Sequence, residues 1–291
     1  IRRPPRSTRK ESSAASDVYK RQNLDIAKWV NENNAFKIGF VPTMGALHNG
    51  HLSLVQKAKQ FSDKIVVSIF VNPTQFGNSN DFDQYPNSIS EDIDLLQQLD
   101  VDVIFLPKSA EELYSDENYN GFSFGSIEKV MEGTHRKGHF DGVARVVKLF
   151  LELIQPDFAF FGEKDYQQLL IIKALTAKIG IKTKIISCET VREIDGLAMS
   201  SRNRRLTTKD RGNASKLYEV LSYCKEHYSF NNIDEIETVC MNKLSEFCNP
   251  EYFEIRNAND LSREVDNCSK MRAFTAVHFG RIRLIDNIAL N

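Results

Sequence analysis

From residue 23 onwards, short apolar runs alternate with longer amphipathic stretches. The apolar runs predict buried strands at residues 38–41, 64–71, 101–106, 158–161 and 184–188. The amphipathic stretches predict helices at residues 24–33, 52–61, 89–99, 143–154 and 166–179. Strands that are apolar on both faces and are separated by helices are typical of a parallel sheet with helices on each side. We therefore predict an α/β fold for residues 23–189.

After about residue 190 the pattern changes. Two helical stretches, at residues 209–227 and 233–247, precede three short apolar runs at residues 252–256, 273–279 and 283–285. The short runs predict antiparallel strands, and residues 190–291 are therefore expected to form a smaller α+β domain. The intervening segment 193–203 is polar and prone to turns, which makes it a candidate hinge.

The first 22 residues fit neither pattern. They are rich in Arg and Ser, do not begin with Met, and carry seven Lys or Arg against two Asp or Glu. A transit peptide has a similar composition but also an amphipathic pattern, which is hard to find here. We expect residues 1–22 to be a disordered, non-native leader and exclude them from the fold prediction.

Composition narrows the class of protein. The chain has 291 residues, 41% hydrophobic and 26% charged, which is ordinary for a globular protein. Its net charge of −1 leaves a mildly acidic body once the basic leader is set aside, which argues against nucleic-acid binding. No stretch is long and apolar enough to span a membrane. Five cysteines without a Cys-x-x-Cys pair suggest reduced thiols and a cytoplasmic location.

Two histidines follow the first predicted strand. Pro42 and Gly45 are expected to end that strand, and His48 and His51 precede the next helix, with Gly50 letting the backbone approach a ligand. A turn that leads into a helix N-terminus favours an anion, and imidazoles there can donate to phosphoryl oxygens. The histidines could instead be helix caps, or half of a metal site. The other histidines and the cysteines offer no obvious third ligand.

Polar residues also follow other predicted strands, where ligands bind in open parallel sheets. Asn72 and Gln75 follow the second strand, and Lys164 and Asp165 follow the fourth. Each group has a plainer explanation, a strand-ending turn for the first and a helix cap for Asp165. The segment 199–202 could grip a polyphosphate or be a polar linker. The basic, glycine-containing loop 132–142 could close over phosphates or be solvated.

The order and spacing of these motifs resemble one known family. The matching stretches are PTMGALHNGHLSLV, SIFVNPTQFG, DFDQYP, EGTHRKGHFDGV, GEKDYQQL, DGLAMSSRN and AVHFGRIRLIDNI. Together they make residues 23–291 similar to the pantoate–β-alanine ligases (pantothenate synthetases), nucleotidyltransferase-superfamily enzymes that share the His-x-Gly-His signature of class I aminoacyl-tRNA synthetases. Departures are few: the leader has no counterpart, the start of the first strand differs, and Ile194 and residues 278–281 vary.

The resemblance implies a set of site residues. His51 would be the catalytic histidine, assisted by His48, Lys164 and Arg202. Gln75 and Gln168 would hold pantoate, with Asn72 as a further substrate contact and Gln75 also near β-alanine. The implied ATP site consists of Met44, Gly45, Ala46, Leu47, His48, Asn49, Gly50, His51, Gly162, Glu163, Lys164, Asp165, Val191, Met199, Ser200, Ser201 and Arg202. No protein site for a resident metal is implied.

The resemblance also implies the reaction and the assembly. Pantoate would attack Mg²⁺-bound ATP to form pantoyl-adenylate and pyrophosphate, and β-alanine would then displace AMP. The expected fold is a Rossmann-like domain with a smaller C-terminal lid, in a cytoplasmic homodimer that binds neither nucleic acid nor membrane. Two alternatives are a plain nucleotidyltransferase, which would form no amide, and a non-catalytic dimeric binding protein. The second would be expected to lack a phosphate-facing residue, and none is missing here.

Overall fold

A computed structural model describes residues 19–20, 22–76, 79–114, 119–264 and 269–291. Its larger sheet has six strands in the order β1-β4-β3-β2-β5-β6, and every pair of neighbours is parallel. The strands are β1 (Tyr19–Lys20), β2 (Ile38–Thr43), β3 (Lys64–Ile69), β4 (Val103–Phe105), β5 (Phe158–Gly162) and β6 (Lys184–Cys188). The predicted α/β fold with a parallel sheet is confirmed.

The short strand β1 was not predicted. Tyr19 and Lys20 pair with Ile104 and Phe105, although both were expected to belong to the disordered leader. Two residues are too few to show a periodic pattern, so the pairing depends on the exposed edge of β4. The prediction for residues 1–18 lies outside the residues that the structure describes.

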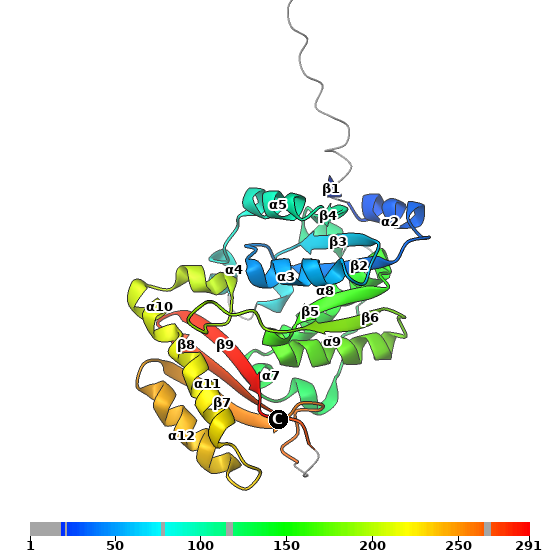
Figure 1. Cartoon of the computed structure of the whole chain (residues 1–291). Helices are drawn as coiled ribbons and strands as arrows, with labels where there is room; N and C mark the ends of the chain where they lie inside the picture. The colour runs from blue at the N-terminus through cyan, green and yellow to red at the C-terminus, as the bar shows by residue number, and fades with distance from the viewer. Residues whose placement is uncertain (1–18, 21, 77–78, 115–118, 265–268) are drawn as a thin grey trace, which may run out of the picture.

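Helices cover both faces of the parallel sheet (Figure 1). On β2, Phe40 packs into the core on one face and Val41 into the core on the other, which explains why the strand is apolar throughout. The first face is covered by α2 (Asn23–Glu32), α8 (His139–Ile154) and α9 (Tyr166–Ile179), and the second by α3 (Asn49–Ala58) and α5 (Ile89–Gln98).

The two central strands separate at their C-terminal ends. β2 pairs with β3 from Ile38 to Thr43, but with β5 only at Gly39 and Phe40. Pro42 was expected to end β2, and this was wrong: the strand continues through it. The Thr43 carbonyl accepts from Phe70 N–H on the β3 side, so Pro42 faces the unpaired β5 side, where a missing N–H costs nothing.

The separation lies at the point where the order in which strands are added to the sheet reverses. From β2 the chain continues to β3 and β4 on one side, and it later returns to add β5 and β6 on the other. Ligands of open α/β sheets bind in the crevice that forms at such a switch point. The fold therefore predicts a site between the ends of β2 and β5.

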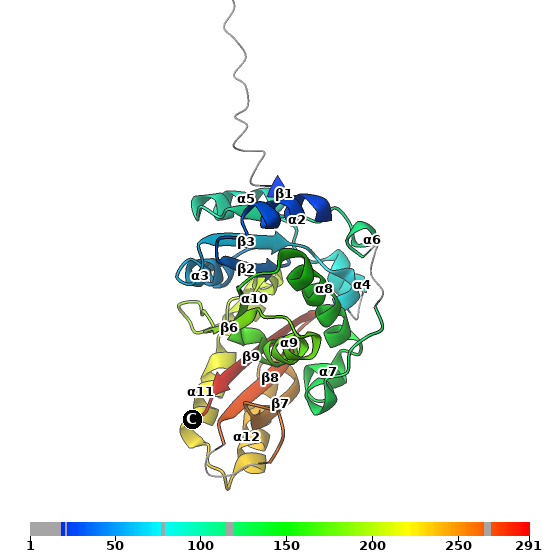
Figure 2. The same cartoon turned by 90° about the vertical axis from the view of Figure 1, so that its right-hand side faces the viewer.

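The C-terminal part contains a three-stranded antiparallel sheet, in the order β7-β8-β9. One face packs against its own helices, and the other packs against the first part of the chain around Met131 and Tyr166 (Figures 1 and 2). The helix predicted over residues 209–227 is two helices that meet at Ser215. The elements are α10 (Thr208–Ala214), α11 (Lys216–His227), α12 (Ile233–Ser245), β7 (Asn249–Asn257), β8 (Met271–Phe279) and β9 (Ile282–Ala289).

Short helical segments connect these elements. They are η1 (Pro73–Gln75), α4 (Ser79–Asp83), α6 (Ala110–Leu113), η2 (Gly125–Glu128), α7 (Glu132–His135), η3 (Glu163–Asp165) and η4 (Ser201–Arg205). Within the part of the chain that is described, no helix has both the length and the apolar character needed to cross a membrane.

The segment η1 is docked tightly on α8. A Cβ atom at Gly142 would lie 2.3 Å from the carbonyl oxygen of Thr74, so the two backbones touch. Asn72 Nδ2 also donates to the Gly142 carbonyl, at 3.0 Å. Glycine at this position of α8 is what allows the turn after β3 to approach so closely.

We expect Gly142→Ala to destabilise the protein, because its methyl group would overlap backbone that cannot move freely. The free energy of unfolding, measured with urea, should fall by roughly 1–3 kcal/mol, the usual cost of overpacking. Gly212→Ala in α10 is the matched control, since a Cβ there meets nothing within 4 Å. Equal stability of the two variants would contradict the proposed contact.

Candidate active site

A cavity of about 220 Å³ lies in the crevice between the ends of β2 and β5. Its wall is formed by residues from segments far apart in the chain, within 42–54, 70–75, 146–150, 160–168 and 189–202, together with Tyr85. The predicted site residues that line it are Met44, His48, Gly50, His51, Gln75, Gly162, Lys164, Asp165, Gln168, Val191, Met199, Ser200, Ser201 and Arg202. Tyr85, Glu189 and Thr190 also line it and were not predicted. The cavity is thus rich in groups that can bind a polyanion.

Six predicted residues do not line this cavity: Gly45, Ala46, Leu47, Asn49, Glu163 and Asn72. Two of them have clear structural duties instead. The Glu163 carboxylate accepts from Arg272 at 3.1 Å, and Asn72 is completely buried, where its Oδ1 accepts from Tyr114 and from Thr74 N–H. Membership of a matching motif therefore does not show that the side chain of a residue reaches the cavity.

A buried carboxylate explains the position of Ala46 and Leu47. Asp92, on α5 and 1% exposed, accepts from the N–H groups of Ala46 and Leu47 at 2.8 and 2.7 Å, and from Ser88 Oγ at 3.2 Å. These amides are therefore not available to a ligand. Gly45 and Ala46 both have positive φ, 81° and 50°. Glycine adopts this region freely, so the strain lies at Ala46, whose N–H this carboxylate holds.

Asp92 was missed by the sequence analysis. Its only signal is an acidic side chain on the face of an amphipathic helix that also buries Leu96, four residues later. A carboxylate in such a position is costly unless it is hydrogen-bonded, and three donors satisfy it here.

His48 is the N-cap of α3. Its Nδ1 accepts from Gly50 N–H at 3.1 Å, so in the neutral ring the proton is on Nε2. A Cβ at position 50 would lie 2.8 Å from His48 Cε1. The glycine thus makes room for the imidazole; it also lines the cavity, and its predicted role in letting the backbone approach a ligand stays a prediction.

His51 lies one turn into α3, with its ring 4.1 Å from that of His48. Burial, then His48 and Lys164, lower the pKa of His51 to about 3. Burial, then Lys164 and Arg204, lower the pKa of His48 to about 4. Both imidazoles are therefore neutral at pH 7, and His48 can offer its Nε2–H to an anion without carrying charge itself.

Lys164 approaches the same cavity from the end of β5. Its Nζ lies 3.7 Å from Asp165 Oδ1, and the Asp165 side chain does not cap α9, contrary to the plainer explanation for it. From β9, Asn287 Nδ2 donates to the carbonyl groups of Glu163 and Lys164, at 3.0 and 2.8 Å. The C-terminal part of the chain thereby fixes the backbone that presents Lys164.

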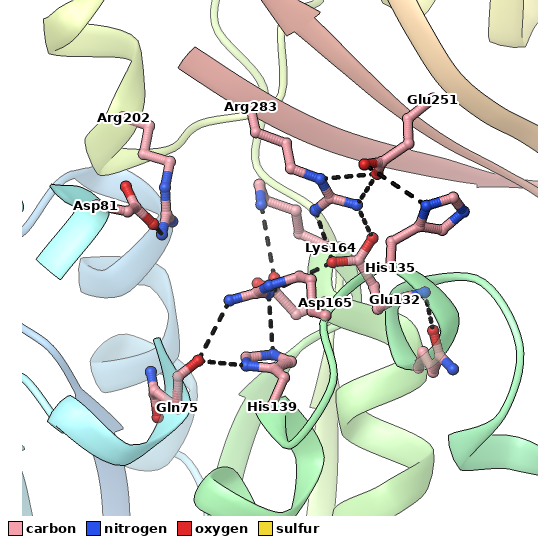
Figure 3. A network of polar contacts seen from close by, with 12 residues as sticks. Gln75, Asp81, Glu132, His135, His139, Lys164, Asp165, Arg202, Glu251 and Arg283 are labelled. Carbon is pink, nitrogen blue, oxygen red and sulfur yellow. Dashed lines mark hydrogen bonds and ion pairs between the residues drawn. The ribbon is translucent and has the colours of Figure 1, made fainter. Parts of the chain in front are cut away.

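Arg202 enters from η4 and is paired with Asp81 of α4, with Nη2 to Oδ2 at 2.7 Å (Figure 3). The same carboxylate binds Arg205 at 3.0 Å, and the Arg202 guanidinium lies 5.5 Å from the Tyr85 ring centroid. Burial raises the pKa of Asp81, but the two arginines outweigh it and the pKa is lowered overall. Asp81 stands in the matching stretch DFDQYP, but no role for it was predicted.

The basic loop 132–142 does not line this cavity, and it is solvated only in part: Lys137 and Gly138 are exposed, whereas Glu132 and His139 are buried. Its Arg136 side chain lies between Glu132 and His139, in a polar network that extends to Arg283 (Figure 3). No group of three or more His, Cys, Asp or Glu side chains that could hold a metal occurs within the described ranges. The half-metal-site alternative for His48 and His51 therefore has no support there.

A switch-point crevice that gathers imidazoles and cations is the arrangement of a protein that acts on a phosphate-bearing ligand. Comparison with known proteins identifies its family. The family model described as pantoate–β-alanine ligase matches residues 18–289. A pantothenate synthetase of Christiangramia forsetii is 46% identical over 259 residues, which cover 87% of this chain and 92% of that protein.

Solved structures agree with these sequence matches. The pantothenate synthetase of Thermus thermophilus superposes with a TM-score of 0.86 at 35% identity, covering 94% of this chain and 99% of that one. A pantoate–β-alanine ligase of Francisella tularensis, complexed with β-γ ATP and β-alanine, gives a TM-score of 0.79 at 40% identity, covering 94% and 97%. The chain belongs to the pantoate–β-alanine ligase family of enzymes.

We expect Asp92→Asn to destabilise the turn before α3, because one of its two acceptor oxygens becomes a donor that faces a backbone N–H. The free energy of unfolding should fall by roughly 1–3 kcal/mol, the cost of leaving a buried polar group unpaired. Asp94→Asn, at an exposed position of the same helix, is the matched control. A urea titration that does not separate the two variants would contradict the role given to Asp92.

Stability should also fall as the pH is lowered from 7 to 5. The pKa of His48 and of His51 is lower in the folded than in the unfolded protein, so the unfolded state binds more protons between about pH 6.5 and 4. Each histidine should contribute roughly 1–2 kcal/mol to the loss. Urea titrations at both pH values should give a smaller loss for His51→Gln than for the wild type. If the loss is unchanged in His51→Gln but reduced in the control His227→Gln, the assignment is wrong.

Proposed function

We propose that this cavity carries out the reaction of its family, the ATP-dependent condensation of pantoate with β-alanine. The product is pantothenate, and ATP is converted to AMP and pyrophosphate through a pantoyl-adenylate intermediate. The observation that carries the proposal is the convergence of His48, His51, Lys164 and Arg202 on one cavity at the switch point of the sheet. The ATP and β-alanine named for the Francisella relative support the same substrates here.

In the first step a carboxylate oxygen of pantoate attacks the α-phosphorus of ATP, and the bond to the pyrophosphate oxygen breaks. The attacking group is already an anion, so no base is needed; the difficulty is the negative charge that accumulates around phosphorus. Neutral His48 and His51 are placed to donate hydrogen bonds to it, and Lys164 and Arg202 supply positive charge.

In the second step the amine of β-alanine attacks the acyl carbon of pantoyl-adenylate. A C–N bond forms, the bond from the acyl carbon to the phosphate oxygen breaks, AMP leaves, and the amine loses a proton. We assign the carboxamides of Gln75 and Gln168 to pantoate, since both line the cavity. The Gln75 Nε2 atom lies 2.6 Å from Met44 Sδ, which keeps this carboxamide at the cavity wall.

Mg²⁺ fits this site as a companion of the nucleotide. Mg²⁺ is commonly held by one or two carboxylates together with substrate phosphates, and it would neutralise part of the phosphate charge. Asp165 and Glu189 are the carboxylates on the cavity wall, and they could complete such a site. A dedicated protein cage is not needed for this role.

Three further features belong to the proposal. The two parts of the chain are two domains that meet near residue 190. The C-terminal domain acts as a lid, since it supplies Arg202 and holds the Lys164 backbone through Asn287.

The resemblance to the family supports a homodimer. The described cysteines, Cys188, Cys224, Cys240 and Cys248, are all free thiols, which supports a cytoplasmic location.

We expect His51→Ala and Lys164→Ala each to lower pantoyl-adenylate formation roughly a hundredfold, the scale of losing one donor to a developing charge. Pantoate-dependent exchange between ATP and pyrophosphate measures this step alone. Lys173→Ala, an exposed lysine on α9, is the matched control and should retain activity. Near-normal exchange by both site variants would contradict the roles of His51 and Lys164.

The products separate this reaction from plain nucleotidyl transfer. With β-alanine present, AMP and pyrophosphate should accumulate in equal amounts together with an amide product. Pyrophosphate without AMP release would favour the nucleotidyltransferase alternative and would overturn the proposed function.

A further inference from the structure

The turn that carries Gln75 is held by a histidine outside the cavity wall. His139, the first residue of α8, has its Nδ1 atom 2.8 Å from the backbone carbonyl oxygen of Gln75 (Figure 3). His139 is 7% exposed and does not line the 220 Å³ cavity, whereas Gln75 does. The smaller cavity that His139 does line, about 30 Å³, has room for a water molecule but not for a substrate.

A neighbouring arginine decides which ring nitrogen of His139 carries the proton. Arg136 Nη1 lies 3.0 Å from His139 Nε2, and a guanidinium can only donate. Nε2 must therefore accept, so the proton is on Nδ1 and is donated to the Gln75 carbonyl. Burial and the charge of Arg136 lower the pKa of His139 to about 4, which agrees with a neutral ring.

Arg136 is in turn fixed by a buried carboxylate. Its Nη1 is 3.4 Å from Glu132 Oε2, and both carboxylate oxygens of Glu132 accept from Arg283 of β9 at 2.7 Å. The Tyr252 hydroxyl also donates to Glu132, at 2.7 Å. Burial raises the pKa of Glu132, but Arg283 and Arg136 lower it to about 2, so it remains ionised.

These contacts form one continuous chain from the C-terminal sheet, through Glu132, Arg136 and His139, to the backbone of Gln75. Every member has a defined donor or acceptor role, so the chain has a single arrangement. Moving the Gln75 carbonyl would leave the Nδ1–H of a buried imidazole unpaired.

From this geometry we propose that His139 is a positioning residue for the pantoate subsite. It holds the turn that carries Gln75 in one orientation and so presents the Gln75 carboxamide to pantoate, without touching the substrate itself. Arg136 selects the tautomer that makes this possible. The inference rests on the proposed function, in which Gln75 binds pantoate.

The first test compares three substitutions at position 139 by their KM values for pantoate and ATP. His139→Phe removes the shorter of two hydrogen bonds to the Gln75 carbonyl, the other coming from Arg136 Nη2 at 3.5 Å. It should raise the pantoate KM roughly tenfold and change the ATP KM by less than about twofold. His139→Asn places an amide N–H where Nδ1 was and should restore most of the loss. His139→Gln reaches towards Arg136 but not towards the Gln75 carbonyl, and should behave like His139→Phe. If His139→Phe does not fold, the Asn and Gln variants decide the question.

A double-mutant cycle separates positioning from general destabilisation. If His139 acts through the Gln75 side chain, His139→Phe should change the pantoate KM by less than about twofold in a Gln75→Ala background, because interacting residues are not additive. A full tenfold effect in that background, or an Asn variant as impaired as the Phe variant, would overturn the inference.

The pH profile of kcat distinguishes positioning from proton transfer. A neutral His139 that only donates a hydrogen bond leaves every limb of the profile in place when it becomes Asn. Loss of a limb in His139→Asn would show that the residue transfers a proton, and the positioning role would be wrong. Failure of the proposed function would look different, since the wild-type chain would then make no amide from pantoate and β-alanine.

Discussion

The hydrogen bonds from Ala46 and Leu47 to Asp92 hold the turn on which the whole site depends. The turn places Ala46 at positive φ, a conformation that costs energy for a non-glycine residue and persists only where the surroundings hold it. Once it is fixed, His48 caps α3 and His51 follows one turn later, so both rings face the crevice between β2 and β5. One carboxylate on α5 thus places the two imidazoles, although it never meets the cavity itself.

The other parts of the site are positioned by the same principle. A side chain from a different element binds the backbone carbonyl of a residue that faces the cavity: His139 for Gln75 and Asn287 for Lys164. Ser201 binds the carbonyl of Ala46 in the turn before α3 in the same way. Backbone anchoring leaves the functional side chains themselves available for a ligand. It also means that residues outside the cavity wall, such as His139 and Asn287, determine much of the geometry of the site.

The sequence predicted the sheet and the convergence of the motifs well, because strands that are apolar on both faces must be buried and parallel strands end at one edge. It could not show that β2 continues through Pro42, because this depends on β5 not pairing with β2 at that residue. Asp92 was missed for the same reason, because the amides of Ala46 and Leu47 that it binds belong to another segment of the chain. A sequence pattern shows which face a residue occupies, but not its partner.

The ion pair between Arg202 and Asp81 has a consequence for selectivity. An anion that binds Arg202 competes with a carboxylate that already satisfies it, so a small anion such as inorganic phosphate exchanges one ion pair for another and gains little. We expect a nucleotide to gain more, since Lys164 and the two imidazoles line the same cavity as Arg202. The ion pair thereby favours a ligand with several charged groups over a small anion that can meet Arg202 alone.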